Sequence, residues 1–244
     1  NRQRAKIING IVTGGADVVG LMELEDDGDG AASAIQDLVN GLNAATASGT
    51  YDFVRSGDIA TDQITVGMIY KPAAVELLGT AAIPLNYGSG SYVPVGRSSL
   101  AQTIRQKSNG AVFTLVVNHF KSKGSSSGGT GDTDANDGQG FSNGTRTRQA
   151  QDLLAWLATK PTSTNDPDYL LIGDFNAYAK EQPMTKLADG GYTNLLSPTS
   201  YSYLFGGEFG SLDHAVGNAS ITSQVTGAEK WHINADEPTS LDYN

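Results

Sequence analysis

The feature that most constrains the fold is a short apolar run followed at once by polar residues. The run Tyr169–Ile172 has no polar alternation and stops at Gly173, which predicts a strand buried on both faces. Asp174 and Asn176 follow two residues apart, so at strand spacing both side chains lie on one side of the backbone. A carboxylate beside a carboxamide offers a hard-oxygen site both a charge and a neutral donor and acceptor. The alternative is that Asp174 only opens a turn.

Three other apolar runs carry a carboxylate or a histidine at or near their ends. They are Leu21–Leu24 with Glu23, Val116–Lys121 with His119, and Ser211–His214 with Asp213. A glutamate between two apolar neighbours is costly to bury unless it is paired or binds a metal, although a water-facing edge strand also accommodates Glu23. A lone histidine is more often structural, but histidine stabilises charge well near neutral pH, which favours a functional role for His119. The four runs together predict one site built from distant segments.

The composition bounds the class of protein. At 244 residues the chain suits one large α/β domain or two small ones, and no linker or repeat divides it, so we predict a single domain over residues 1–244. The lack of cysteine excludes disulfides, thiolate zinc sites and a cysteine nucleophile. No apolar run is long enough for a membrane span, and no membrane partner is expected. The chain opens without the features of a signal peptide, as a mature or trimmed chain also does.

The charge balance argues against nucleic-acid binding through the overall field of the protein. Asp and Glu number 26 against 16 Lys and Arg, for a formal net charge of -10. An acidic protein that binds a phosphate-bearing substrate needs a local basic strip and a bridging divalent metal. The candidate strip consists of Lys121, Lys123, Arg146 and Arg148. The acidic, lysine-poor composition also fits a secreted or salt-exposed protein.

Hydrophobic periodicity divides the chain into helices and strands. Helical spacing predicts helices over residues 2–14, 33–42 and 145–157, and a helix or turn over 178–187. Strands are predicted over residues 16–24, 51–55, 63–70, 74–78, 100–104, 111–120, 169–172, 200–205 and 211–216. This order implies an α/β (α+β) fold, a two-sheet β-sandwich flanked by helices in four layers. The active-site groups then gather at one end of the sheets.

The four motifs, in their order along the chain, resemble the endonuclease/exonuclease/phosphatase superfamily, which has the deoxyribonuclease-I-like fold. The resemblance is greatest to its secreted bacterial extracellular nucleases, in which residues 118–124, 138–140 and 231–244 also have counterparts. It covers nearly all of the chain. The motif Gly173–Ala177 is specific, whereas the other matches are weak singly and strong together.

The resemblance implies a role for each motif residue. Glu23 is expected to bind the essential divalent cation, and hard oxygen ligands without thiolates favour Mg²⁺ or Mn²⁺. The remaining implied roles are activation of the attacking water by Asp174, a hydrogen bond to the phosphate from Asn176, transition-state stabilisation by His119, and pairing of Asp213 with a catalytic histidine. Arg97 is expected to help hold the substrate, although Ser98-Ser99 follows it where an Arg-Pro pair is commoner.

By this resemblance the protein is a metal-dependent endonuclease acting on DNA, with RNA as a further substrate, in the extracellular space or the periplasm. Two alternatives remain. One is a phosphomonoesterase or sphingomyelinase-like enzyme of the same fold, and the other is an inactive adhesion or binding module. Retention of four residues together argues against the inactive module: Glu23, His119, Asp174 and Asn176.

An additional Ca²⁺ is an alternative for two acidic loops. Residues 25–30, and the carboxylates of Asp132, Asp134 and Asp137, offer oxygen ligands without the ordered spacing of a calcium loop. For residues 25–30 we therefore predict a loop that caps the following helix.

Two segments implied by the resemblance have no match in this chain. Family members begin with a strand that carries an Asn near the metal, and they end with a Ser-Asp-His strand whose His pairs with an upstream Asp. Asp213 matches that upstream Asp, and the sequence continues well past His214, so we expect His214 to be a packing residue. The expected partners are nucleic acid and the remaining segments of the domain, from a longer chain or a second polypeptide. Residues 1–244 alone are expected to be inactive.

Overall fold

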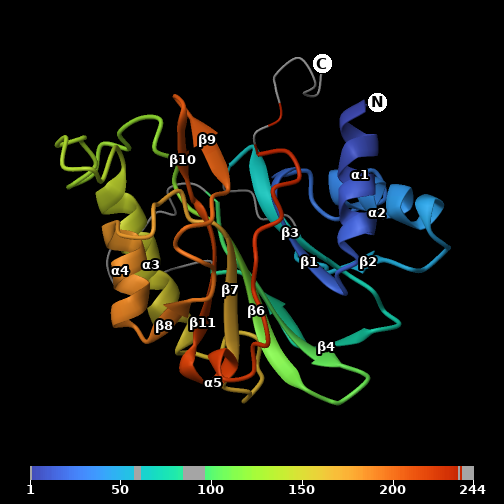
Figure 1. Cartoon of the computed structure of the whole chain (residues 1–244). Helices are drawn as coiled ribbons and strands as arrows, with labels where there is room; N and C mark the ends of the chain where they lie inside the picture. The colour runs from blue at the N-terminus through green and yellow to red at the C-terminus, as the bar shows by residue number, and fades with distance from the viewer. Residues whose placement is uncertain (1, 58–61, 85–96, 236, 238–244) are drawn as a thin grey trace.

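Two sheets stacked face to face form the centre of the molecule, with helices on the outer face of each (Figure 1). The structure, a computed structural model, describes residues 2–57, 62–84, 97–235 and 237. Along the chain the elements are α1 (Arg2–Gly14), β1 (Val18–Glu25), α2 (Ala34–Ala45), β2 (Asp52–Phe53), β3 (Ile64–Tyr70), β4 (Val75–Ala82), β5 (Leu100–Gln106), β6 (Val112–His119), α3 (Asn143–Leu157), β7 (Tyr169–Asp174), α4 (Gln182–Asp189), β8 (Tyr192–Asn194), β9 (Tyr203–Phe205), β10 (Glu208–Gly210), β11 (Asp213–Asn218) and α5 (Ala219–Thr222).

The layer order confirms the predicted fold class. The larger sheet has the strand order β4-β5-β6-β7-β11-β8, and the smaller has the order β1-β3-β2. Helices α1 and α2 cover the small sheet, while α3 and α4 cover the large one (Figure 1). No helix in the described part of the chain is both long and apolar enough to cross a membrane.

Each space between layers holds a hydrophobic core. The core under α3 and α4 includes Leu153, Leu187 and Leu171, the core under α1 and α2 includes Ile8, Leu42 and Ile69, and the core between the sheets includes Met68, Ile104 and Val117. The central strands β6 and β7 therefore face a core on both sides, and this is why they read as apolar runs without alternation.

Some elements differ from the sequence prediction. Helix α4 begins at Gln182 instead of residue 178, with Pro183 in its first turn, where a missing N–H costs nothing. The predicted strand 200–205 is shorter and does not join the main sheets, because β9 pairs with β10 alone. Gly206 and Gly207 both have positive φ, which allows the two-residue turn of this hairpin.

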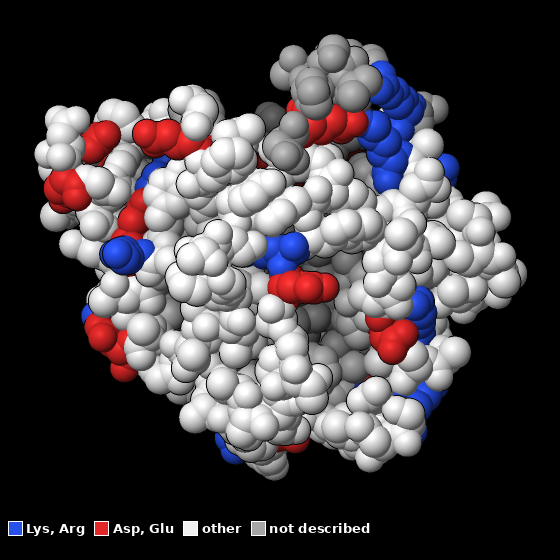
Figure 2. Space-filling model, in the orientation of Figure 1, with Lys and Arg blue, Asp and Glu red and all other residues white. Residues whose placement is uncertain are grey.

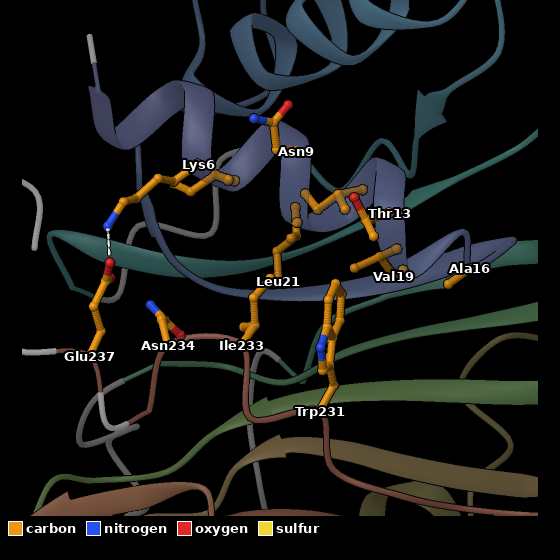
Figure 3. Close-up of a pocket in the computed structure, with 14 residues that line it drawn as sticks. Lys6, Asn9, Thr13, Ala16, Val19, Leu21, Trp231, Ile233, Asn234 and Glu237 are labelled. Carbon is orange, nitrogen blue, oxygen red and sulfur yellow. Dashed lines mark hydrogen bonds and ion pairs between the residues drawn. The ribbon is translucent and has the colours of Figure 1, made fainter. Parts of the chain in front are cut away.

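A cavity of about 610 Å³ lies beside β1, which is the edge strand of the small sheet (Figure 3). It is lined by α1, by Val19 and Leu21 of β1, and by Trp231 and Ile233 from the end of the described chain. The side chains of Trp231 and Ile233 remain 56% and 52% exposed. An ion pair of 2.7 Å between Lys6 and Glu237 joins the same segments. An uncharged strand edge, Val18 to Met22, thus borders an apolar cavity.

Candidate active site

Three adjacent strands of the large sheet bring the predicted site residues to one edge. His119 ends β6, Asp174 ends β7 and Asp213 begins β11. Because β6 runs parallel and β11 antiparallel to β7, the register pairs both His119 and Asp213 with Asp174. His119 Nε2 lies 3.7 Å from Asp174 Oδ2. The strand ends therefore place a histidine and two carboxylates together, as the sequence predicted.

Asn176 belongs to the same group through the turn that follows β7. Its backbone N–H donates to Asp174 Oδ1 at 2.7 Å, and its Nδ2 donates to Asp174 Oδ2 at 3.2 Å and to the carbonyl of Phe120 at 3.0 Å. Asn176 has a φ of 47°, a left-handed conformation that asparagine tolerates better than most residues. These bonds fix the orientation of the Asp174 carboxylate.

Glu23 reaches this edge from the small sheet through a bulge. In the pairing of β1 with β3, Leu21 faces Gly67 and Leu24 faces Thr65, so Met22 and Glu23 together oppose one residue. Glu23 has a φ of 59°, a conformation that costs about 1 kcal/mol or more for a residue other than glycine. Its carboxylate is near enough to Asp174 to raise the pKa of that group. A strained bulge at this position is typical of a functional residue.

The electrostatic environment of Asp174 is unusual for a carboxyl group. Burial is the main cause that raises its pKa to about 7, and the negative charges of Asp213 and Glu23 add to this effect. The N–H of Asn176 and the charge of Arg97 act in the opposite direction. A carboxyl group with a pKa near neutrality exchanges a proton with water readily at physiological pH.

The crowding of negative charge around Asp174 fits a divalent cation. No group of three or more His, Asp or Glu side chains within the described ranges is arranged to hold a metal by protein ligands alone. Mg²⁺ commonly uses only one or two carboxylates and completes its shell with water and substrate phosphate. Glu23 would supply one such oxygen ligand, and the nearby charge of Asp174 would add to the attraction. A cation there would offset the repulsion that raises the pKa of Asp174.

Arg97 occupies the position facing His119. Its Nη2 donates to His119 Nε2 at 2.5 Å, so the imidazole accepts at Nε2 and carries its proton on Nδ1. Burial, and next the charge of Arg97, lower the pKa of His119 to about 4. Arg97 also donates to the carbonyl of Phe120 at 3.3 Å and lies 3.5 Å from Asp62. His119 is therefore neutral here, with Nε2 as an acceptor. Its predicted bond to a phosphate oxygen requires Arg97 to leave Nε2 and a proton to bind there, because a phosphate oxygen only accepts.

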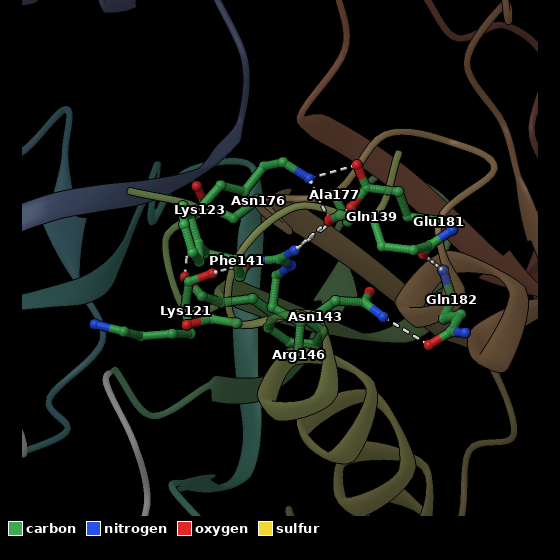
Figure 4. A network of polar contacts seen from close by, with 12 residues as sticks. Lys121, Lys123, Gln139, Phe141, Asn143, Arg146, Asn176, Ala177, Glu181 and Gln182 are labelled. Carbon is green, nitrogen blue, oxygen red and sulfur yellow. Dashed lines mark hydrogen bonds and ion pairs between the residues drawn. The ribbon is translucent and has the colours of Figure 1, made fainter. Parts of the chain in front are cut away.

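The predicted basic strip is not a continuous surface, and the prediction is wrong for Arg146. This side chain has no exposed area, and it bridges the loop before α3 and the chain after β6 (Figure 4). Its guanidinium donates to the carbonyls of Lys121, Gln139 and Phe141 and lies 3.5 Å from Glu181. Arg146 therefore holds the loop in place and cannot contact a substrate in this structure.

Two further members of the strip have partners within the protein. Lys123 pairs with Glu181, and Arg148 donates to the carbonyl of Thr130 at 3.1 Å and lies 3.8 Å from Asp132. Lys121 is the member of the strip whose side chain has no described partner. On the face shown in Figure 2, Lys and Arg side chains are scattered, and acidic side chains gather over the loop before α3. The local positive field is weaker than the sequence suggested.

The strand β11 presents two titratable groups with different roles. Burial raises the pKa of Asp213, while a hydrogen bond from Ser202 and the charge of Lys230 lower it. His214 has both ring nitrogens satisfied, by the carbonyl of Ala177 at 2.8 Å and by Asn194 Nδ2 at 3.1 Å. His214 is thus a packing residue, as predicted. Ser202 and Lys230 were not predicted as site residues, although Lys230 directly precedes residues 231–244, which have counterparts in the extracellular nucleases.

The acidic loops are explained by capping. Asp27 accepts from the N–H of Ala34 at 3.0 and 3.1 Å, which confirms the predicted capping loop at the start of α2. Asp132 accepts from the N–H of Gly129 and from both the N–H and the hydroxyl of Thr145, at 3.0, 2.7 and 2.7 Å. These contacts give the carboxylates a structural role without calcium.

Comparison with known proteins agrees with this fold. A family model described as the endonuclease/exonuclease/phosphatase family matches residues 1–233, and no curated protein matches the chain. The human Nocturnin catalytic domain is similar at a TM-score of 0.58 and 18% identity, over 89% of this chain and 75% of that one. A mannosyl-6-phosphatase from Bacteroides thetaiotaomicron VPI-5482 has a TM-score of 0.60 and 11% identity, over 90% and 77%. D. rerio TDP2, complexed with a single-strand DNA product, has a TM-score of 0.51 and 15% identity, over 89% and 76%.

These solved structures show the fold, and the family model shows the class of chemistry. Members of the family hydrolyse phosphoester bonds and generally depend on a divalent metal. The strand-end cluster of His119, Asp174 and Asp213, with Glu23 opposite, is the place in this fold where such chemistry has an acid–base group and oxygen ligands together. The chain therefore belongs to the endonuclease/exonuclease/phosphatase family.

Proposed function

We propose that this protein is a metal-dependent phosphodiesterase, a secreted endonuclease that hydrolyses DNA and accepts RNA as a second substrate. The observation that carries the proposal is the setting of Asp174, which is near two carboxylates and also near the Arg97–His119 pair. Phosphodiester hydrolysis needs a group that takes a proton from water, oxygen ligands for a cation, and a positive group for the phosphate. The single-strand DNA bound to D. rerio TDP2 supports a nucleic-acid substrate. The acidic composition supports secretion.

The roles follow from the contacts of each residue. Asp174 accepts the proton of the attacking water, and the two hydrogen bonds from Asn176 keep its carboxylate oriented for this step. Arg97 is the positive group next to the reacting phosphate, and His119 positions it through the bond at Nε2. Glu23 would hold the metal beside Asp174, and the metal would neutralise charge on the phosphate and the leaving oxygen.

A phosphate diester fits this site better than a monoester. A monoester carries an additional negative charge near neutral pH and needs correspondingly more positive groups around it. Of the five predicted cations, Arg146 is buried, Lys123 is paired with Glu181 and Arg148 is paired with Asp132, which leaves Arg97 and Lys121 in the described part of the chain. Because a mannosyl-6-phosphatase is among the similar structures, hydrolysis of phosphate monoesters is the alternative function to be tested.

The proposal is tested with two small substrates that differ by one methyl group. We expect the native protein to hydrolyse methyl p-nitrophenyl phosphate, a diester, faster than p-nitrophenyl phosphate, a monoester, and to nick plasmid DNA. EDTA should abolish each activity, and Mg²⁺ or Mn²⁺ should restore it. Full activity in EDTA would disprove metal dependence. Faster hydrolysis of the monoester would favour the phosphatase.

Replacing Glu23 by glutamine is expected to weaken metal binding while leaving the fold intact. The amide keeps the size of the side chain but removes a negative oxygen ligand, so we expect the Kd for Mn²⁺ to rise about tenfold or more. Calorimetric titration with Mn²⁺ measures this change. Glu25→Gln, in the same exposed part of β1, is the matched control and should bind like the wild type. Equal Kd values for Glu23→Gln and the wild type would remove Glu23 from the metal site.

We further infer that an additional apolar strand pairs with the free edge of β1 in the native protein. The support is the uncharged edge from Val18 to Met22 beside the cavity under α1 (Figure 3), because natural edge strands usually carry charges or proline that block pairing. A strand paired on one side leaves about every second amide open, whereas pairing on both sides protects consecutive amides. Hydrogen exchange should therefore show protection at successive residues of β1. Open alternate amides would show that the edge is free.

A further inference from the structure

The residues around the catalytic edge include a set of aromatic side chains that the mechanism does not use. The hairpin of β9 and β10 leads directly into Asp213, three residues after Gly210, and Tyr178 follows Asn176 by two residues. Tyr178, Tyr203 and Phe209 are 39%, 38% and 61% exposed. Figure 1 shows the hairpin standing beyond the ends of β7 and β11. Large aromatic side chains are seldom this exposed next to a site without a binding role.

These aromatic residues form two groups, one on each face of the hairpin. Tyr203 and Gly210 are cross-strand partners, and the ring of Tyr178 covers Gly210 so closely that a Cβ there would lie 2.3 Å from Cε1. On the opposite face, Phe209 contacts Tyr201 edge to face with ring centroids 4.6 Å apart. Tyr201 in turn stacks on His232 at 3.9 Å. We call Tyr178, Tyr201, Tyr203 and Phe209 the aromatic rim.

The second group is connected to the catalytic edge by hydrogen bonds. Ser202, between Tyr201 and Tyr203, accepts the backbone N–H of Asp213 at 3.2 Å. His232 contacts the hydroxyl of Ser200 at 3.3 Å, and Lys230 donates to the carbonyl of the same residue at 3.4 Å. The second group therefore adjoins the segment that holds Asp213.

The cations near the site provide little phosphate affinity. Arg146 is buried, and Lys123 and Arg148 are paired with Glu181 and Asp132. Lys230, beside Asp213, donates to Ser200 and Ser211. Of the predicted phosphate-binding cations in the described part of the chain, Arg97 and Lys121 remain, and Arg97 itself lies 3.5 Å from Asp62. Each phosphate contact adds to affinity and to its salt dependence, and a protein with one or two such contacts binds a duplex weakly. Stacking of a base on an aromatic side chain contributes about 1–3 kcal/mol per base and needs no positive charge.

Resting on the proposed function, we infer that the aromatic rim binds unpaired bases and that the preferred substrate is single-stranded nucleic acid. A duplex keeps the faces of its bases inside the stack, where the rim cannot reach them, and it offers mainly phosphates to an acidic protein. A single strand can present a base to Phe209, the most exposed ring of the aromatic rim, while its backbone crosses the catalytic edge. Binding then depends on whether the bases are paired or unpaired. It depends little on the base sequence, because every base has an aromatic face.

The test measures the binding of fluorescent oligonucleotides by anisotropy in EDTA, which prevents cleavage. We expect an oligothymidine about twelve nucleotides long to bind roughly tenfold or more tightly than the duplex of the same length. An abasic oligonucleotide of equal length has the same phosphates without bases and should bind as weakly as the duplex. The slope of log affinity against log salt should be small, about -1, in keeping with one or two phosphate contacts.

Variants of Phe209 test whether the preference for the single strand over the duplex comes from the aromatic rim. Phe209→Ala and Phe209→Leu should each weaken binding of the single strand about fivefold or more, and Phe209→Tyr should retain it, since tyrosine still stacks. Melting temperatures confirm that each variant is folded. Equal affinity for single strand and duplex, equal affinity for the abasic oligonucleotide, or wild-type binding by Phe209→Leu would overturn the inference. Failure of the proposed function has a separate signature, because the wild type would then show no metal-dependent hydrolysis of methyl p-nitrophenyl phosphate.

Discussion

The Asp174→Asn variant is expected to lose about 10³-fold in kcat for diester hydrolysis while it keeps its fold. Asparagine cannot take a proton from water and lacks the negative charge that attracts a cation. Its amide oxygen can still accept the N–H of Asn176, so the turn after β7 remains supported. Rates with methyl p-nitrophenyl phosphate and melting curves measure both effects.

The matched control for this variant is Asp189→Asn at the end of α4, where the side chain is 66% exposed. This change should leave the rate within about twofold of the wild type, as expected for a surface position. If Asp174→Asn kept a comparable rate, the proton would have to go to another group. Asp213, the other carboxylate at this edge, would then be the next residue to replace.

The pH dependence of metal binding provides a second measurement on Asp174. Because the pKa of this group is about 7 without metal, a proton occupies the carboxylate at lower pH and competes with the cation. The affinity for Mn²⁺ should therefore fall by up to about tenfold per pH unit below pH 7 and level off above it. In Asp174→Asn this dependence should disappear. A constant Kd in the wild type from about pH 6 to about pH 8 would contradict the assignment.

Replacing Gly173 by alanine is expected to be the most destabilising single change at the site. Gly173 has a φ of 133°, which side chains other than glycine rarely adopt, and a Cβ there would lie 2.0 Å from the carbonyl oxygen of Asn118. That carbonyl belongs to the adjacent strand β6, so relief requires the strands to move apart. We expect a loss of about 4 kcal/mol in the free energy of unfolding, or roughly 10 °C in Tm.

Gly227→Ala is the control for this prediction. A Cβ at Gly227 meets nothing within 4 Å, and its backbone lies outside the left-handed region. Its Tm should stay within about 2 °C of the wild-type value. Gly173→Ala should also lose activity, because separation of β6 from β7 displaces His119 from Asp174. A Tm equal to that of the wild type would show that β6 and β7 can separate locally without cost.

The sequence alone determined those features that follow from the burial of a single segment, because burial is visible in that segment's own pattern of apolar residues. Residues 169–172 could be identified as a central strand because a strand covered on both faces must be apolar throughout, and the structure extends it to Asp174. The polar residues just after that run, together with Glu23 inside another apolar run, marked the catalytic edge for the same reason. A charge in an apolar context needs a partner, and this need is visible in the sequence.

Only the tertiary structure decided which positively charged side chains remain available to bind a phosphate. Arg146 looked like a phosphate ligand at the start of a helix, but the loop before α3 folds over it and satisfies its guanidinium with carbonyls. Arg97 was expected beside the substrate, and its contact with His119 Nε2 comes from the segment just before β5, the strand next to β6. The pairing of β9 with β10, which exposes Phe209, likewise depends on contacts that no local pattern records. The burial of a strand covered on both faces is visible in its own apolar run. The burial of a polar side chain such as Arg146, and the partners of any side chain, are decided by segments that become neighbours only on folding.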